Sequence, residues 1–226
     1  MVIMPLNCNN YLENVKEYDI MYLVEYYGGF MIKDNSKLKL SFNSPIIICF
    51  TGICLLALLL DMLTGGFTNK ILFSVYNSSL LNPLTYIRFI GHVFGHSGWE
   101  HFIGNIMLIL VVGPLLEEKY GSIDIAMVIL ITALVTGLVN FIFFPHVHLL
   151  GASGVVFALI LLSSITSFRD GEVPITFILV ACIYIGQEIY KGIFINDNVA
   201  NLTHIIGGFV GAVLGFLMNM HKVRNN

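Results

Sequence analysis

The residues best suited to chemistry in this chain are a serine, two histidines and an asparagine near the starts of apolar segments. His101 and Asn105 are four residues apart, which places both side chains on one face of a helix. Ser153 opens a second apolar segment within a Gly-Ala-Ser-Gly sequence, and His204 opens a third. A serine hydroxyl becomes a good nucleophile when a neighbouring base takes its proton. The set predicts nucleophilic catalysis if the segments bring Ser153 and His204 together.

Composition indicates which elements must position these side chains. Of the 226 residues, 57% are hydrophobic and 11% are charged, against about 45–50% and about 25% in soluble domains. A helix that crosses a bilayer needs about 20 mostly apolar residues. Six such stretches occur, which we place at Pro45 to Leu63, His101 to Leu116, Ile123 to Phe144, Gly151 to Ser167, Val173 to Tyr190 and Asn201 to Met220.

This pattern predicts an all-α fold, an integral membrane six-helix bundle over residues 45–220. Residues 1–44 are expected to form a short N-terminal cytosolic segment and residues 221–226 a cytosolic tail. Lys and Arg collect in cytoplasmic loops, and an N-terminus placed inside leaves eight of the 11 Lys and Arg residues on the cytoplasmic side. We therefore expect a multi-pass protein of the cell membrane with both termini in the cytoplasm. The second, fourth and sixth helices then run inward from the outer face, so their first residues share one depth.

Small residues predict how the fourth and sixth helices pack. At about 100° per residue, three glycines lie within about 60° of His204 on the helix surface: Gly207, Gly211 and Gly215. A matching pair, Gly154 and Ala158, lies beside Ser153. Small residues four apart allow two membrane helices to approach closely. This packing would bring Ser153 and His204 into contact.

The loop before the second helix, residues 64–100, is long and unusually apolar, which is typical of a segment in the membrane interface. Its end, Ser97-Gly98-Trp99-Glu100, matches a capping box with Ser97 at the N-cap and Glu100 three residues on. The second helix is therefore expected to begin at about Gly98, with His101 in its first turn.

Each polar residue also has a structural explanation when it is taken alone. A serine in a membrane helix usually packs as a small residue, and a histidine or asparagine often bridges two helices. The convergence of four polar side chains at one depth favours a site, because helix packing does not require it and polar groups are costly in lipid.

Four motifs in order carry a family resemblance. They are HSGWEHFIGN at residues 96–105, EEKYGS at 117–122, GASG at 151–154 and HIIG at 204–207. Together they resemble the ordered motifs of the rhomboid intramembrane serine proteases, over a region from about Leu84 to Gly215. A single GASG motif is common, but the whole set in this order is specific.

The resemblance implies that Ser153 attacks the scissile carbonyl while His204 acts as the general base. It also implies that the oxyanion meets the Ser153 backbone N–H and the side chains of His101 and Asn105. Gly151 and Gly154 support the nucleophile, and Phe157 is placed to stack on the His204 ring, where the family often has tyrosine.

No acidic residue is placed to complete a triad. The nearest acids in sequence, Glu188 and Asp197, fit surface or interface charges better, so we expect a Ser-His dyad. The resemblance further implies transmembrane protein substrates, cut near the outer leaflet of the lipid bilayer, with access between the second and fifth helices. No cofactor and no metal are expected.

Two other functions remain as alternatives, and nucleic acid binding is not among them. The net charge of −3 provides no basic surface for nucleic acid. The first alternative is a catalytically inactive rhomboid-like protein that binds membrane clients. The second is a metal-ion carrier, but the sequence lacks the internal repeat symmetry of many carriers. Five histidines suggest it: His92, His96, His101, His146 and His148.

Overall fold

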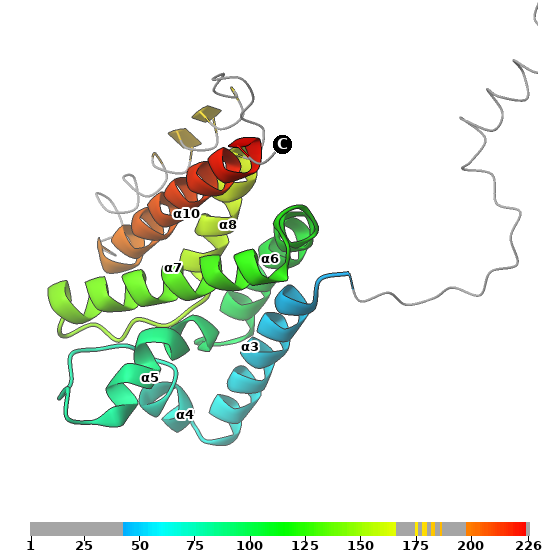
Figure 1. Cartoon of the computed structure of the whole chain (residues 1–226). Helices are drawn as coiled ribbons and strands as arrows, with labels where there is room; N and C mark the ends of the chain where they lie inside the picture. Colours follow the sequence, from blue (N-terminus) through cyan, green and yellow to red (C-terminus); the bar gives the residue numbers. More distant parts are fainter. Residues whose placement is uncertain are drawn as a thin grey trace, which may run out of the picture. The chain divides into compact units, whose positions relative to one another are not determined.

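The computed structural model describes residues 43–165 and 198–224, together with residues 175, 178, 179, 182, 183 and 186 between them. These residues form an all-helical arrangement (Figure 1). Its elements are α3 (Pro45–Leu63), α4 (Phe67–Ile71), α5 (Pro83–Gly91), the 3-10 turn η2 (His92–Phe94), α6 (Trp99–Tyr120), α7 (Ser122–Phe143), α8 (Ser153–Ile165) and α10 (Asn198–Arg224). In this part of the chain the β-type pairing is a single isolated antiparallel bridge between Val75 and Leu149.

Three of these helices are long and apolar enough to cross a membrane: α3, α6 and α7. The prediction for α3, Pro45 to Leu63, coincides with the observed bounds. α8 and the stretch Thr203–Met218 of α10 are shorter apolar helices. The predicted fifth span, Val173 to Tyr190, lies outside the described residues apart from six positions. The described residues are thus all-helical, with three candidate membrane spans among them, and the count of six spans stays a prediction.

α6 begins one residue later than the expected Gly98, at Trp99, and this shift overturns the predicted capping box. Gly98 occupies the N-cap position, and no side chain caps the helix. The Ser97 hydroxyl instead lies 3.2 Å from Nδ1 of His101, one helical turn along the chain. The prediction that Ser97 caps α6 is therefore wrong.

The start of α3 is capped by a residue that is distant in sequence. The carboxylate of Glu117, near the end of α6, accepts the backbone N–H groups of Ile46 and Ile47 at 3.0 Å each. It also accepts the Ser122 hydroxyl at 2.6 Å, and only 3% of the Glu117 residue surface is exposed. A carboxylate at a helix N-terminus meets free N–H donors and the positive end of the helix dipole. Glu117 thereby ties α3, α6 and α7 together.

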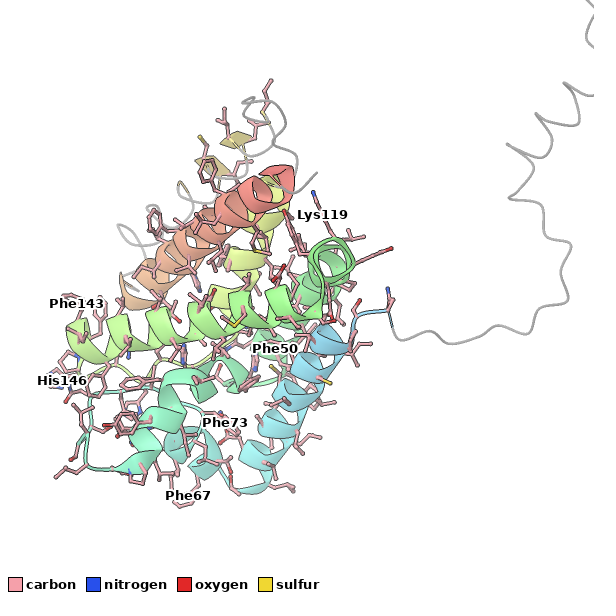
Figure 2. All side chains as sticks on the ribbon, viewed as in Figure 1. Phe50, Phe67, Phe73, Lys119, Phe143 and His146 are labelled. Carbon is pink, nitrogen blue, oxygen red and sulfur yellow. The ribbon has the colours of Figure 1, made fainter. Side chains whose placement is uncertain are left out.

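The core is organised around α8, which contacts α6, α7 and α10. Its buried residues occur on all sides of the helix, as expected for a central helix: Gly154, Val155, Val156, Ala158, Leu159, Leu161, Leu162 and Ile165. α7 crosses the width of the described bundle, from the end of α6 near Lys119 to Phe143 (Figure 2).

The segment between α3 and α6 is held by polar side chains. Asp61 accepts from the backbone N–H of Asn69 at 2.7 Å and from its Nδ2 at 2.8 Å, and Nδ2 also donates to the carbonyl of His96 at 2.9 Å. Buried Arg88 donates to the hydroxyls of Tyr76 and Ser78. The same segment exposes five large apolar side chains, which a position in the membrane interface would cover: Phe67, Leu80, Leu81, Tyr86 and Ile87.

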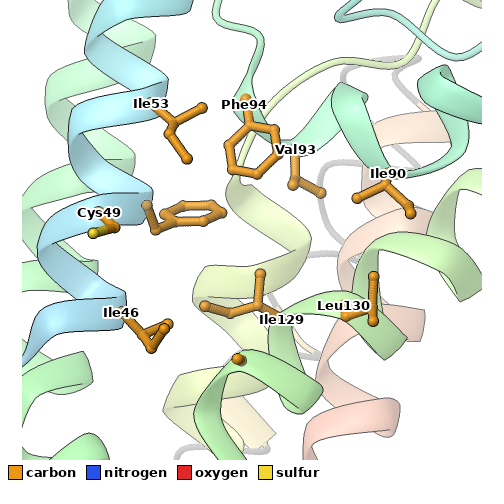
Figure 3. A pocket seen from close by; sticks show the side chains of 10 residues that line it. Ile46, Cys49, Ile53, Ile90, Val93, Phe94, Ile129 and Leu130 are labelled. Carbon is orange, nitrogen blue, oxygen red and sulfur yellow. The ribbon is translucent and has the colours of Figure 1, made fainter. Parts of the chain in front are cut away.

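A pocket of about 230 Å³ opens between α3, η2 and α7 (Figure 3). Its lining consists of apolar side chains and one cysteine: Ile46, Cys49, Phe50, Ile53, Ile90, Val93, Phe94, Ala126, Ile129 and Leu130. The pocket holds none of the residues singled out for chemistry. Its lining provides neither a general base nor an array of donors for a developing charge.

Candidate active site

Ser153 and His204 meet across the interface between α8 and α10. Ser153 is the first residue of α8, and its Oγ lies 2.7 Å from Nε2 of His204. Both side chains are half-buried, and 51 positions separate them in the sequence. This distance is that of a hydrogen bond, and such a contact would let an imidazole take the proton of a hydroxyl.

The glycine pattern explains why the two helices come close enough. A Cβ at Gly207 would lie 2.8 Å from the Cα of Gly154, and a Cβ at Gly211 would overlap the backbone of Ala158. α8 and α10 lie side by side in Figure 1. The predicted close packing of these helices through small residues is confirmed.

The backbone before Ser153 is fixed at two points. Leu149 exchanges two backbone hydrogen bonds with Val75, at 2.9 and 3.0 Å, and the N–H of Gly151 donates to the carbonyl of His92 at 2.9 Å. Gly151 has φ +130°, a conformation that L side chains rarely adopt. A glycine is therefore required at position 151, both for the turn into α8 and for the close approach of the neighbouring side chains.

His101 and Asn105 face this same turn. A Cβ at Gly151 would lie 2.8 Å from Nε2 of His101 and 3.9 Å from Nδ2 of Asn105. Nδ2 of Asn105 is buried, and no hydrogen-bond partner for it is found among the described residues. α8 begins at Ser153, so the N–H of Ser153 is among the first helix donors, which have no partner within the helix. Three donors of the predicted set thus surround the start of α8.

Phe157 contacts the His204 ring. The ring centroids lie 4.8 Å apart and the planes are tilted by 45°, which is within the range of favourable aromatic contacts. Gly154 packs against α10, and Gly151 forms the turn, so each predicted supporting residue lies at the pair. Glu188 and Asp197 lie outside the described residues.

Two of the five histidines that suggest a metal-ion carrier, His92 and His96, are buried near the turn. His92 Nδ1 lies 3.3 Å from the carbonyl of Arg88, and its Nε2 lies 3.2 Å from the hydroxyl of Thr136. Burial lowers the pKa of His92 to about 4. Burial and the neighbouring His101 lower the pKa of His96 to about 4. Both rings are neutral near pH 7, and they serve as packed, hydrogen-bonded parts of the scaffold.

The contributions of Ser97 and of the His92 carbonyl were not anticipated. A backbone carbonyl is common to every residue, so no sequence signal marks the bond from Gly151 to His92. The position of Ser97 three residues before Glu100 predicts a helix cap, and its contact with His101 carries no separate sequence signal. Within the described ranges, no group of three or more His, Cys, Asp or Glu side chains is arranged to hold a metal ion.

Comparison with known families identifies the family of this sequence. A family model described as Rhomboid domain matches residues 83–221, which is more than half of the chain and includes Ser153, His204, His101 and Asn105. This chain belongs to the rhomboid family. The rhomboid is accordingly an integral, multi-pass membrane protein.

Several known rhomboids are similar to this one. Rhomboid-related protein 2 from Mus musculus is 32% identical over 61% of this chain and 52% of its own length. Rhomboid protease GlpG from Haemophilus influenzae is 25% identical over 81% of this chain and 95% of its own length. Putative rhomboid protease YdcA from Bacillus subtilis is 28% identical over 66% of this chain and 75% of its own length.

The present rhomboid covers only part of some relatives. It spans about half the length of the mouse protein, 52%, and 41% of Rhomboid-related protein 1 from Caenorhabditis elegans.

Proposed function

We propose that this rhomboid is an intramembrane serine endopeptidase that cleaves transmembrane segments of membrane proteins near the outer leaflet. Ser153 is the nucleophile and His204 the general base. The observation that carries this proposal is the 2.7 Å separation of Ser153 Oγ and His204 Nε2, from two helices held together by glycines.

The reaction follows from this contact. The Ser153 hydroxyl donates to Nε2 of His204, which takes the proton as Oγ bonds to the scissile carbonyl carbon. His204 then returns the proton to the leaving amine as the peptide C–N bond breaks, which leaves an ester on Ser153. Water then loses a proton to His204 as its oxygen bonds to the ester carbonyl carbon, and His204 passes that proton to Oγ of Ser153 as the ester C–O bond breaks. This releases the new carboxyl terminus and restores the free hydroxyl.

The oxyanion of each tetrahedral intermediate needs fixed donors in a site that excludes water. The Nε2–H of His101, the Nδ2 of Asn105 and the backbone N–H of Ser153 take this role. Support comes from the position of both side chains at Gly151 and from the buried Nδ2 of Asn105, for which the described residues offer no acceptor. Losing one such donor typically lowers kcat about 100- to 1000-fold.

In the membrane, six spans over residues 45–220 place both termini in the cytoplasm of a cell-membrane protein, with cytosolic segments at 1–44 and 221–226. Ser153 and His101 near the starts of α8 and α6 then lie toward the outer face. A substrate helix hides its scissile carbonyl in its own hydrogen bonds. Substrates are therefore single-span proteins with Gly, Pro or other weak helix formers near the cut, admitted between the second and fifth helices.

The decisive experiment uses a serine-reactive fluorophosphonate and a panel of single-span substrates in liposomes. Wild type is expected to be labelled and to cleave at least one substrate, whereas Ser153→Ala does neither and His204→Ala loses cleavage. Ser164→Ala, at another serine of α8, is the matched control and retains both activities. Equal labelling of wild type and Ser153→Ala would refute the assignment of Ser153. An unlabelled wild type that binds substrates without cutting them would favour an inactive, client-binding rhomboid.

A further inference from the structure

The two ring nitrogens of His101 face different partners. Nδ1 lies 3.2 Å from Oγ of Ser97, a residue that precedes α6 and does not cap it. Nε2, on the other side of the ring, lies 2.8 Å from the position of a Cβ at Gly151. One nitrogen therefore meets a hydroxyl, and the other meets the turn that leads to Ser153.

A neutral imidazole carries one proton, and the nitrogen without it acts as an acceptor. A hydroxyl that donates to Nδ1 leaves the proton on Nε2 and restrains rotation of the ring. We propose that Ser97 is a positioning residue for His101, because its hydroxyl donates to Nδ1 and keeps Nε2–H directed at the turn before Ser153. This inference rests on the proposed function, in which Nε2–H is an oxyanion donor.

The His96 ring packs against the same ring. The His96 and His101 ring centroids are 5.1 Å apart, with the planes inclined by 64°. His96 is fixed in turn, because its Nδ1 donates to the carbonyl of Phe94 at 3.1 Å and its own carbonyl accepts from Asn69. The low pKa of His96, about 4, leaves its ring uncharged near pH 7. His101 thus has a rigid neighbour on one side, and Ser97 is the polar group that selects which nitrogen carries the proton.

The first test measures the tautomer without any need for catalysis. In protein labelled with ¹⁵N in its histidine rings, the His101 signals are assigned by their loss in His101→Asn. Wild type and Ser97→Thr are expected to show an unprotonated Nδ1 and a protonated Nε2. Ser97→Ala is expected to shift both signals toward a mixture of tautomers. Unchanged His101 signals in Ser97→Ala would overturn the inference, whatever the protease assays show.

The second test measures transition-state stabilisation. Ser97→Ala is expected to lower kcat about two- to tenfold, which is the range of one net hydrogen bond. The variant is expected to keep the KM and the thermal unfolding midpoint of wild type. Ser97→Thr restores kcat. Added to His101→Ala, Ser97→Ala has no further effect, because Ser97 acts through that ring. An equal loss of kcat in both backgrounds contradicts the inference. If cleavage proves independent of Ser153, the proposed function fails, and the NMR result still decides the role of Ser97.

Discussion

Gly207 of α10 lies against Gly154 of α8, so closely that a Cβ at Gly207 would be 2.8 Å from the Cα of Gly154. Ser153 immediately precedes Gly154, and His204 lies three residues before Gly207, about one helical turn away. A close approach of the two backbones thus lies within about one turn of the contact between the hydroxyl and the imidazole. The separation of α8 and α10 sets the distance between Ser153 and His204.

Gly207→Ala is expected to push α10 away from α8 and to lower proteolytic activity about 100-fold, because a displacement of about 1 Å can cost that much. Activity against a single-span substrate measures the effect. Gly104→Ala is the matched control, since a Cβ at Gly104 meets no atom within 4 Å, and it retains activity. Wild-type activity in Gly207→Ala would show that the close packing does not position the pair.

Glu117→Ala is expected to destabilise the fold by about 3 kcal/mol, because two backbone N–H groups of α3 and the Ser122 hydroxyl lose a charged acceptor. Thermal or denaturant unfolding in detergent measures the loss. Glu118→Ala is the control, since Glu118 is exposed and next in sequence. Equal stability of the two variants would contradict the capping role of Glu117.

Phe157→Ala is expected to lower kcat about two- to tenfold, because an aromatic contact of this kind is worth about 0.5–1.5 kcal/mol and restrains the His204 ring. Phe157→Tyr keeps the ring and is expected to retain wild-type kcat. Steady-state kinetics with one substrate compares the variants. A kcat in Phe157→Ala equal to that of wild type would remove Phe157 from the positioning of His204.

Stability is expected to fall as the pH is lowered from about 6.5 to 4. His92 and His96 have pKa values lowered from 6.5 to about 4 in the folded protein, so the unfolded chain binds more protons in this window. Above pH 6.5 both states are neutral at these rings and the effect is absent. Thermal midpoints from pH 7.5 to 4.5 test this expectation.

Variants separate the buried rings from the other titrating groups. His92→Gln is expected to be less stable at pH 7.5 but to lose less stability on acidification. His146→Gln, at an exposed histidine, is expected to follow the wild-type pH profile. A pH profile in His92→Gln that parallels wild type would assign the acid sensitivity to other groups.

Several elements of the fold could be predicted because they depend on local composition. The bounds of α3 were predicted to the residue, since an apolar run of span length between polar residues determines a membrane helix almost alone. The approach of Ser153 to His204 was also predictable. Glycines four residues apart on α10 mark the face that can pack closely against another helix, and His204 lies on that face. The capping box failed because the N-cap residue depends on where the backbone turns into the helix, and Gly98 makes that turn.

The sequence by itself determined the membrane class, the bounds of α3 and the polar residues that the helix starts carry, because hydrophobic length and helical periodicity are properties of short stretches. It did not reveal α4 and α5, which lie within the segment predicted as a loop. Only the tertiary structure decided that Glu117 caps α3, that the His92 carbonyl holds Gly151, and that Ser97 faces His101 rather than the helix end. These contacts depend on separations held to within a few tenths of an ångström, between groups that many residues can supply. Such distances are set only when the whole bundle has packed.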